Sequence, residues 1–415
     1  MFDRDRWKEI YESLTANKIR TVLTAFGVGW GILMLILMIG AGNGLEKGVK
    51  REMSGMATNS VFMWGRSTSI PYKGFREGRW VRFNNRDIDA LRSQVPEIEH
   101  LSPSLQLGGW RGGNNVSYGN KIGAFEVNGY LPVAKNVKLI NDIEGRFINQ
   151  KDIDEMRKVV VIGERVWEVL FNRSHDFLGK HITILGLNFQ VVGKFKSSRY
   201  GDSADRENQS VYIPFTTFQR SFNQGDRVGW FILTSKPEIS ATVVEKKARE
   251  VLKRMHNIHP EDERAIGGWN AEEEFNAMNM VFTGIRVLGW IVGIMTLLAG
   301  IIGISNIMLV IIRERTKEIG IRRSIGARPS NIIVQIVLEA LTLTFFAGTA
   351  GFMVGVGILE VLGSQLEHDA FTNPEIDIWV SLSALSLLII SGLIAGIMPA
   401  VKAVKIRPIE ALRGQ

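Results

Sequence analysis

The chain has 415 residues, of which 45% are hydrophobic and 22% are charged, and its formal net charge is +8. It contains no cysteine, which excludes disulfide bonds and thiol chemistry. The basic residues that decide the interpretation stand next to long apolar stretches. We therefore read the positive charge as a signal of membrane orientation and predict no nucleic-acid partner.

Residues 1–20 are predicted to form a short amphipathic helix on the cytoplasmic side. Apolar side chains recur there at helical spacing, at Trp7, Ile10, Tyr11 and Leu14. Tryptophan and tyrosine favour the level of the lipid headgroups, which predicts contact with membrane lipids. Packing against the protein itself explains the pattern equally well.

Four stretches carry hardly any charge and are each long enough to cross a membrane as a helix. We predict transmembrane helices over residues 21–45, 287–312, 331–359 and 378–401. The polar segment before the first stretch is too long for a signal peptide, so we interpret this stretch as an uncleaved anchor. Glycines four residues apart, which let helices pack closely in lipid, occur at Gly27 and Gly31, Gly351 and Gly355, and Gly392 and Gly396.

Residues 46–286 separate the first two spans and have the mixed composition of a folded domain. We predict mixed α and β structure with helical ends that lead into the membrane. The glycine-rich stretch 108–120 is expected to be a loop or irregular sheet. The clearest elements are strands at 60–64 and 211–214, an apolar run at 158–163, helices at 86–93, 164–171 and within 236–255, and a hairpin of 181–187 with 189–195.

His256 and His259 stand beside the acidic residues 261–263, a composition that superficially resembles a metal site. Pro260 follows His259 directly, so the pair falls in a turn and not on one face of a helix. We therefore predict a solvated polar loop and no metal site.

The segment that re-enters the membrane carries a heptad-like seam, with apolar or small residues at alternating spacings of three and four. Its members are Phe275, Met278, Phe282, Ile285, Gly289, Val292, Thr296, Ala299, Gly303 and Asn306. We favour a stalk in which the seam pairs with a second copy of the chain. Packing of the same face on the first span of the same chain is the alternative.

A dense basic block follows the second span, at residues 313–330. It holds Arg313, Arg315, Lys317, Arg322, Arg323 and Arg328 against Glu314 and Glu318. The loop between the last two spans, 360–377, holds five carboxylates and no Lys or Arg. Because positive loops stay inside, both termini, the tail 402–415 and the 313–330 loop are expected in the cytoplasm, and the large domain outside. The basic loop is the expected contact point for a cytoplasmic partner.

Glu339 is the ionisable residue that stands well inside a predicted span. A charge in the membrane is costly and usually faces a partner. Glu339 therefore belongs either to an ion path or to a structural bond with a neighbouring helix or with the basic loop. Asn306, on the seam, is a natural hydrogen-bonding group between helices. We interpret both as assembly residues.

Motifs for intrinsic catalysis are missing from the sequence. There is no P-loop pattern G-x-x-x-x-G-K-[ST], and no G-x-S-x-G or H-E-x-x-H motif. We predict that the chain is not an enzyme by itself and has no cofactor of its own.

Several motifs closely resemble the MacB/FtsX-type permeases of ABC transporters. They lie at 17–27, 306–309, 315–322, 326–328, 339–340, 396–400 and 406–412, and in the large domain at 160–163, 178–180, 189–193 and 212–214. The resemblance implies an integral membrane α-helical protein with four transmembrane helices and a large mixed α/β extracytoplasmic domain between helices 1 and 2. It also implies a place in the bacterial inner membrane, with the large domain periplasmic.

The resemblance further implies how such a chain works. Two copies, or one copy with a paralogous permease, would pair with separate ATPase subunits that bind ATP and Mg²⁺. ATP hydrolysis would then move the periplasmic domain through the membrane helices, a mechanism called mechanotransmission. The basic loop would be the coupling helix that contacts the ATPase, through Arg313, Glu314, Arg315, Thr316, Lys317, Glu318, Ile319, Gly320, Ile321 and Arg322.

Export of periplasmic substrates, with a periplasmic adaptor and an outer-membrane channel, is the task we expect. The sequence EIGIRR at 318–323 resembles the macrolide exporter of this family more than the lipoprotein-releasing permeases. Two alternatives are lipoprotein release by the same mechanics and a signalling module that activates a cell-wall hydrolase.

Overall fold

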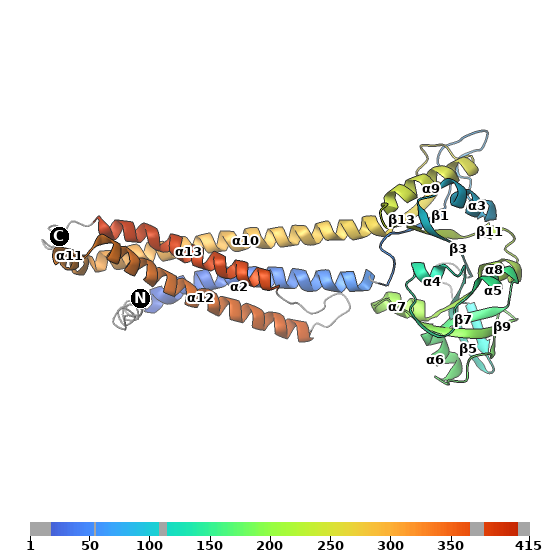
Figure 1. Cartoon of the computed structure of the whole chain (residues 1–415), viewed down its shortest axis with the longest axis horizontal. Helices are drawn as coiled ribbons and strands as arrows, with labels where there is room; N and C mark the ends of the chain where they lie inside the picture. Colours follow the sequence, from blue (N-terminus) through green and yellow to red (C-terminus); the bar gives the residue numbers. More distant parts are fainter. Residues whose placement is uncertain (1–17, 54, 108–113, 366–376, 406–415) are drawn as a thin grey trace. The chain divides into compact units, whose positions relative to one another are not determined.

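The computed structural model describes residues 18–53, 55–107, 114–365 and 377–405. The predicted amphipathic helix at 1–20 lies almost wholly outside the described residues, as do most of the loop 360–377 and of the tail 402–415. The chain divides into two compact units, which are coloured by sequence in Figure 1. Residues 1–48 and 280–415 make up the helical unit, and residues 49–279 make up the α/β unit.

Within the described residues, four long apolar helices confirm the prediction and make up most of the helical unit. They are α2 (Lys18–Met53), α10 (Ala271–Glu314), α12 (Pro329–Gln365) and α13 (Ile378–Val404), with the short α11 (Thr316–Ser324) between α10 and α12. Each long helix has an apolar window sufficient to cross a membrane. The helices run beyond the predicted spans, because a helix does not have to stop where its side chains become polar.

Glycines bring these helices into close contact. Gly351 of α12 lies against α2, where an added Cβ atom would collide with the backbone of Gly29. Gly31 of α2 faces α10, and Gly392 and Gly396 of α13 face α12. The three predicted glycine pairs therefore lie at contacts between helices, as expected for close packing in lipid.

The seam on α10 packs partly on α2 of the same chain. Ile285 lies against Gly42, and Gly289 lies against Met38. Asn306, farther along α10, is exposed on the single chain. For this part of the seam the contacts favour the alternative that the sequence left open, packing on the first span. Pairing with a second copy stays a prediction.

Replacing Gly351 by leucine is expected to destabilise the helical unit by about 1–3 kcal/mol or more. The new side chain would meet the backbone of Gly29, so α2 and α12 would have to move apart. Gly357→Leu on the same helix is the matched control, because a Cβ added at Gly357 meets nothing within 4 Å. The two variants are compared by thermal melting of the full chain in detergent, in which gel filtration of heated samples measures the fraction that stays folded. Equal melting temperatures would contradict the close contact.

The α/β unit is built from short elements whose bounds follow. The strands are β1 (Ser60–Gly65), β2 (Phe83–Asn84), β3 (Ile98–Leu107), β4 (Asn114–Tyr118), β5 (Lys121–Tyr130), β6 (Asp142–Gly145), β7 (Val159–Gly163), β8 (His181–Ile184), β9 (Leu187–Lys196), β10 (Ser210–Pro214), β11 (Arg227–Val228), β12 (Trp230–Ser235) and β13 (Ile266–Asn270). The helices are α3 (Asn85–Gln94), α4 (Ala134–Val137), α5 (Gln150–Asp154), α6 (Glu164–Phe171), α7 (Gly201–Asn208), α8 (Phe215–Ser221) and α9 (Ala241–Met255).

One large sheet organises the described part of this unit. Its strands follow the order β10-β7-β9-β8-β4-β5-β3-β12-β1-β13, with β6 on β9. Because β10 also pairs with β5 in parallel, the strands from β10 to β5 close into a ring. The strands β3, β12, β1 and β13 continue as an antiparallel sheet, which α9 contacts. The strands β2 and β11 pair separately.

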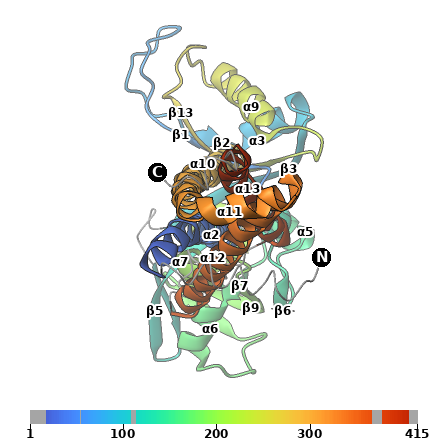
Figure 2. The same cartoon turned by 90° about the vertical axis from the view of Figure 1, so that its left-hand side faces the viewer.

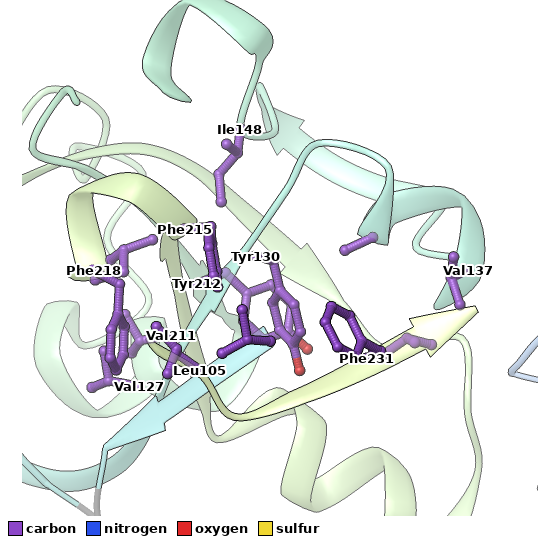
Figure 3. Packing of buried hydrophobic residues seen from close by; sticks show 14 of the residues in the cluster. Leu105, Val127, Tyr130, Val137, Ile148, Val211, Tyr212, Phe215, Phe218 and Phe231 are labelled. Atoms are coloured by element: carbon purple, nitrogen blue, oxygen red, sulfur yellow. The ribbon is translucent and has the colours of Figure 1, made fainter. Parts of the chain in front are cut away.

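Aromatic side chains fill the core next to the ring of strands (Figure 3). Tyr212 of β10 stacks on Phe195 of β9, with ring centroids 4.6 Å apart. Tyr130 of β5 meets Tyr212 edge to face at 5.0 Å, and Figure 3 shows that their hydroxyl oxygens end close together. A buried hydroxyl needs a hydrogen-bond partner, so the core must supply polar groups at this point.

A buried ionic network supplies them. Lys138 Nζ, just after α4, lies 2.8 Å from Glu207 Oε1 on α7. The hydroxyl of Tyr212 donates to the same oxygen at 3.0 Å, and that of Ser197 donates to Oε2 at 2.6 Å. Burial alone would raise the pKa of Glu207. The charges of Lys138 and Arg199, with the hydrogen bonds from Lys138 and Ser197, outweigh burial and lower that pKa from 4.5 to about 2.

Candidate coupling site at the basic inter-helix segment

The basic segment forms a short helix between two long ones. Helix α10 ends at Glu314, and Arg315 leaves the helical conformation, with φ −94° and ψ 14°. Helix α11 follows immediately, and its last turn is closed by Gly326 at φ +97°, a conformation that glycine adopts without strain. Pro329 then begins α12, a first position where proline needs no hydrogen bond.

The inner face of α11 and the residue before it are tied to two long helices. Arg315 Nη1 lies 3.4 Å from Glu339 Oε1, inside α12. Arg322 donates to Gln335 Oε1 of α12 at 3.2 Å. Arg323 donates to the carbonyl oxygen of Val404 at 2.6 Å, which satisfies one of the open acceptors at the end of α13. These side-chain bonds, together with buried Ile319 and Gly320, fix the position of α11.

A small cavity lined by both apolar and polar side chains lies between α10, α11 and α12. Its volume is about 30 Å³, and its lining includes Arg315, Glu318, Arg322, Gln335 and Glu339. A cavity of this size, with polar groups on one part of its wall, has room for a water molecule. Glu339 is thus structurally bonded to the basic segment, which is one of the two readings that the sequence left open.

The outer face of α11 is exposed. Lys317, Glu318 and Ile321 are exposed, and Glu318, which also reaches the rim of the cavity, pairs with Arg322 at 2.6 Å. Ile325, directly after α11, is 82% exposed. Ile321, four residues earlier, is 46% exposed, so two aliphatic side chains lie next to each other on this charged segment and mark it as the candidate docking surface. Figure 2 looks onto this end of the helical unit.

The predicted coupling residues therefore separate into two sets. One set is turned inward or half-buried and comprises Arg315, Ile319, Gly320 and Arg322. The other set is exposed and comprises Arg313, Glu314, Lys317, Glu318 and Ile321. Thr316 stands apart, because its hydroxyl donates to the carbonyl oxygens of Ile312 and Arg313.

Two residues that contribute to the site were missed in the sequence. Ile325 repeats the position of Ile321 one helical turn later, a signal that could have been found, whereas the role of Gln335 has no sequence signal.

Four of the predicted stalk residues lie along the first half of α10, and Asn306 lies in its second half. In the α/β unit, Phe275 packs under Lys50, with Nζ 5.8 Å from the ring centroid, and Met278 is half-buried. In the helical unit, Phe282 is buried and Ile285 contacts α2. Their part in self-association is an untested prediction.

The histidine cluster departs from the predicted solvated loop. His256 Nε2 lies 2.8 Å from Oδ2 of Asp87, and both side chains are largely buried. The sequence placed His256 next to acidic neighbours, but its partner comes from α3. Within the described ranges, no group of three or more His, Asp or Glu side chains is arranged to hold a metal ion.

Comparison with known families settles the relationship. Residues 21–251 match the MacB-like periplasmic core domain, and residues 290–408 match the FtsX-like permease C-terminal region. The chain belongs to the MacB/FtsX-type permease family. The resemblance and the fold class are confirmed: this is a multi-pass membrane permease whose α/β unit is a periplasmic core domain.

Named relatives of this permease are exporters. It is 30% identical over 426 residues to the pyoverdine export ATP-binding/permease protein PvdT of Pseudomonas savastanoi pv. phaseolicola, covering 99% of this chain and 61% of that protein. It is 26% identical over 404 residues to the macrolide export ATP-binding/permease protein MacB of Bdellovibrio bacteriovorus, covering 97% and 60%. The MacB-like permease thus spans about 60% of the length of these relatives.

A solved structure of the family is also similar. The periplasmic region of MacB from Actinobacillus actinomycetemcomitans shares 21% identity with this permease, with a TM-score of 0.43. The match covers 55% of this chain and 95% of that one.

Proposed function

We propose that this MacB-like permease converts ATP hydrolysis by a separate ABC ATPase subunit into movement of its periplasmic domain. The movement would drive export of periplasmic substrates with an adaptor and an outer-membrane channel, and two copies would form the working unit. The observation that carries the proposal is α11, a basic helix with an exposed outer face and an inner face bonded to α12 and α13.

The two faces of α11 suit a part that receives force and passes it on. A partner seated on Lys317, Ile321 and Ile325 would move α11 as a whole. Because Arg322 and Arg323 bond to α12 and α13, that displacement would be passed to both helices. Packed helices respond to such a shift as rigid bodies, which is a common way for a signal to cross a protein.

Charge placement supports the membrane orientation that the proposal needs. The segment with α11 is basic, and the loop after α12 is acidic, so we place α11 and both termini in the cytoplasm. Glu339 is paired with Arg315 and therefore is a poor candidate for an ion path. Export, as opposed to lipoprotein release or hydrolase activation, is favoured by the names of the two exporters given above.

Replacing Ile325 by aspartate is expected to weaken binding of the ABC ATPase about 30-fold or more. A charge at a central apolar contact costs about 2 kcal/mol or more, and 1.4 kcal/mol corresponds to a factor of ten in Kd. Titration of the purified ATPase against the permease in nanodiscs measures the change. Ile122→Asp, at a residue of β5 that is 67% exposed, is the matched control and should bind normally. If the ATPase bound the Ile325→Asp variant with unchanged affinity, the segment of α11 and Ile325 would not be the docking surface.

A further inference from the structure

An arm of chain leaves the periplasmic core domain between β1 and β2, at residues 66–82. It carries five basic residues, Arg66, Lys73, Arg76, Arg79 and Arg82, against the single acidic residue Glu77. Three aromatic residues, Tyr72, Phe75 and Trp80, are interleaved with them. We call this segment the basic arm. In Figure 2 it is the blue loop that extends beyond β1 and β13.

The basic arm projects from the end of the sheet that is remote from the start of α10. Strand β1 pairs with β13 in antiparallel, and Val61 faces Asn270, directly before α10 begins. At the other end of the same pair Gly65 faces Ile266, and the arm starts at the next residue. The arm is therefore separated from the start of α10 by the length of the β1–β13 pair.

The fold holds the basic arm in one shape. Asp262, which is fully buried, accepts hydrogen bonds from the backbone and hydroxyl of Ser69 at 2.6 and 2.7 Å, and from the Ile70 nitrogen at 3.1 Å. Burial alone would raise the pKa of Asp262, but these hydrogen bonds lower it. Arg79 donates to the His256 carbonyl oxygen at 2.6 Å, and its guanidinium lies 4.4 Å from the centroid of the Phe75 ring. A pre-formed arm loses little conformational entropy on binding.

The side chains that the arm presents have the composition of a protein interface. Trp80 is 58% exposed and Phe75 is 44% exposed, and Lys73, Arg76 and Arg82 are exposed beside them. Tryptophan and arginine dominate the binding energy of protein interfaces, where the aromatic ring fills a pocket. The excess of basic residues calls for an acidic surface around that pocket.

We propose that the basic arm is a docking surface for a periplasmic protein with an acidic face. A polyanionic glycan or a lipid surface would use the charges alone, whereas a fixed arm with separately held Phe75 and Trp80 matches pockets of fixed shape. The inference goes beyond the coupling function and does not depend on the ATPase, because the arm belongs to the periplasmic core domain.

Photo-crosslinking tests the proposal on the full chain in native membranes. A benzophenone amino acid replaces Trp80, and in a matched control it replaces Ile122, which is 67% exposed on β5. We expect a discrete protein adduct from position 80 only, with an excess of Asp and Glu in the crosslinked segment found by mass spectrometry. Adducts with lipid, glycan, a second copy of this chain or a segment without acidic excess, or no adduct, would overturn the proposal.

Reversing two charges of the basic arm tests whether the position-80 adduct comes from specific docking or from chance contact. Lys73→Glu with Arg76→Glu changes two exposed side chains, so the melting temperature should stay the same. The yield of the position-80 adduct should fall about tenfold or more, which corresponds to about 1.4 kcal/mol of lost attraction. Raising the salt from about 0.01 M to about 1 M should lower the yield of the unreversed arm in the same way, because surface charges are then screened. If the yield of the position-80 adduct changed with neither charge reversal nor salt, the proposal of an acidic partner would be overturned.

Discussion

Replacing Glu207 by glutamine is expected to destabilise the periplasmic core domain by about 3–5 kcal/mol. The variant keeps the shape of the side chain but leaves the ammonium of Lys138 without its counter-charge in a site where both side chains are almost fully buried. The Tyr212 hydroxyl also loses a charged acceptor. At about 2–4 °C for each kcal/mol in a domain of this size, Tm should fall by roughly 6–20 °C. Thermal melting of the full chain in detergent, followed by tryptophan fluorescence, measures the change.

Two further variants show whether the charge itself is responsible. Glu144→Gln breaks a pair with Lys194 of similar length, 3.0 Å, but Glu144 is 42% exposed. Its effect should be within about 1 kcal/mol, the range of surface pairs. The double variant Lys138→Met with Glu207→Leu removes both buried charges and should recover much of the loss. A single Glu207→Gln variant as stable as the original protein would contradict the network.

The pH dependence of stability tests whether the charge of Glu207 stabilises the fold. The pKa of Glu207 is lowered from 4.5 to about 2 in the folded domain, so its charge stabilises the fold fully above pH 4.5 and the contribution is lost as pH falls toward 2. That lowering corresponds to about 3 kcal/mol, at 1.36 kcal/mol for each tenfold change. The difference in Tm between the original protein and Glu207→Gln should therefore narrow over this interval. A difference that stayed constant over this interval would assign the effect to a cause other than the charge of Glu207.

Local patterns were sufficient for the elements that carry their own periodicity. Helix α6 (Glu164–Phe171) has the predicted bounds, because an apolar face follows a buried strand and an asparagine ends it in the left-handed conformation. The hairpin of β8 and β9 is confirmed, since Gly186 supplies the positive φ that its tight turn requires. The four apolar helices were predictable for the same reason: length and the absence of charge are local properties.

Contacts between distant parts of the chain were not predictable. Strand β3 contains Pro103 and reads poorly as a strand, yet pairing with β12 and β5 stabilises it. Lys138 and Glu207 are 69 residues apart, so no spacing rule connects them. On α10 the seam indicated that a partner helix exists. A heptad pattern does not say which helix that is, and Ile285 and Gly289 contact α2 of the same chain.

The candidate coupling site shows the same division between local and distant information. Its charge excess, its place after an apolar span and its turn at Gly326 were visible in the sequence. The sequence also marked Glu339 as a costly charge that needs a partner. The sequence did not show that the partner of Glu339 is Arg315. Several basic residues lie nearby, and which of them reaches Glu339 depends on the angle between α10 and α11.

Under the proposed coupling function, replacing Glu339 by glutamine is expected to uncouple the permease from the proposed partner ATPase. Glu339 is 4% exposed and pairs with Arg315, directly before α11, so its charge positions the inner end of that helix. Arg315 is 30% exposed and can turn toward water, which limits the loss of stability to about 1–3 kcal/mol. The outer face of α11 would remain available. ATPase binding should therefore stay within a few-fold, while permease-stimulated ATP hydrolysis falls about tenfold or more, equivalent to about 1.4 kcal/mol.

Separate measurements of binding and stimulated hydrolysis distinguish this outcome from lost docking. Glu360→Gln removes an exposed carboxylate from the same helix, far from α11, and should leave both quantities unchanged. The swapped pair, Arg315→Glu with Glu339→Arg, restores opposite charges across the α11–α12 contact and should recover part of the coupling. If Glu339→Gln stimulated hydrolysis normally, the ion pair would be a packing feature without a role in transmission. If it lost binding and stimulation together, Glu339 would act by placing the docking face, not by relaying its movement.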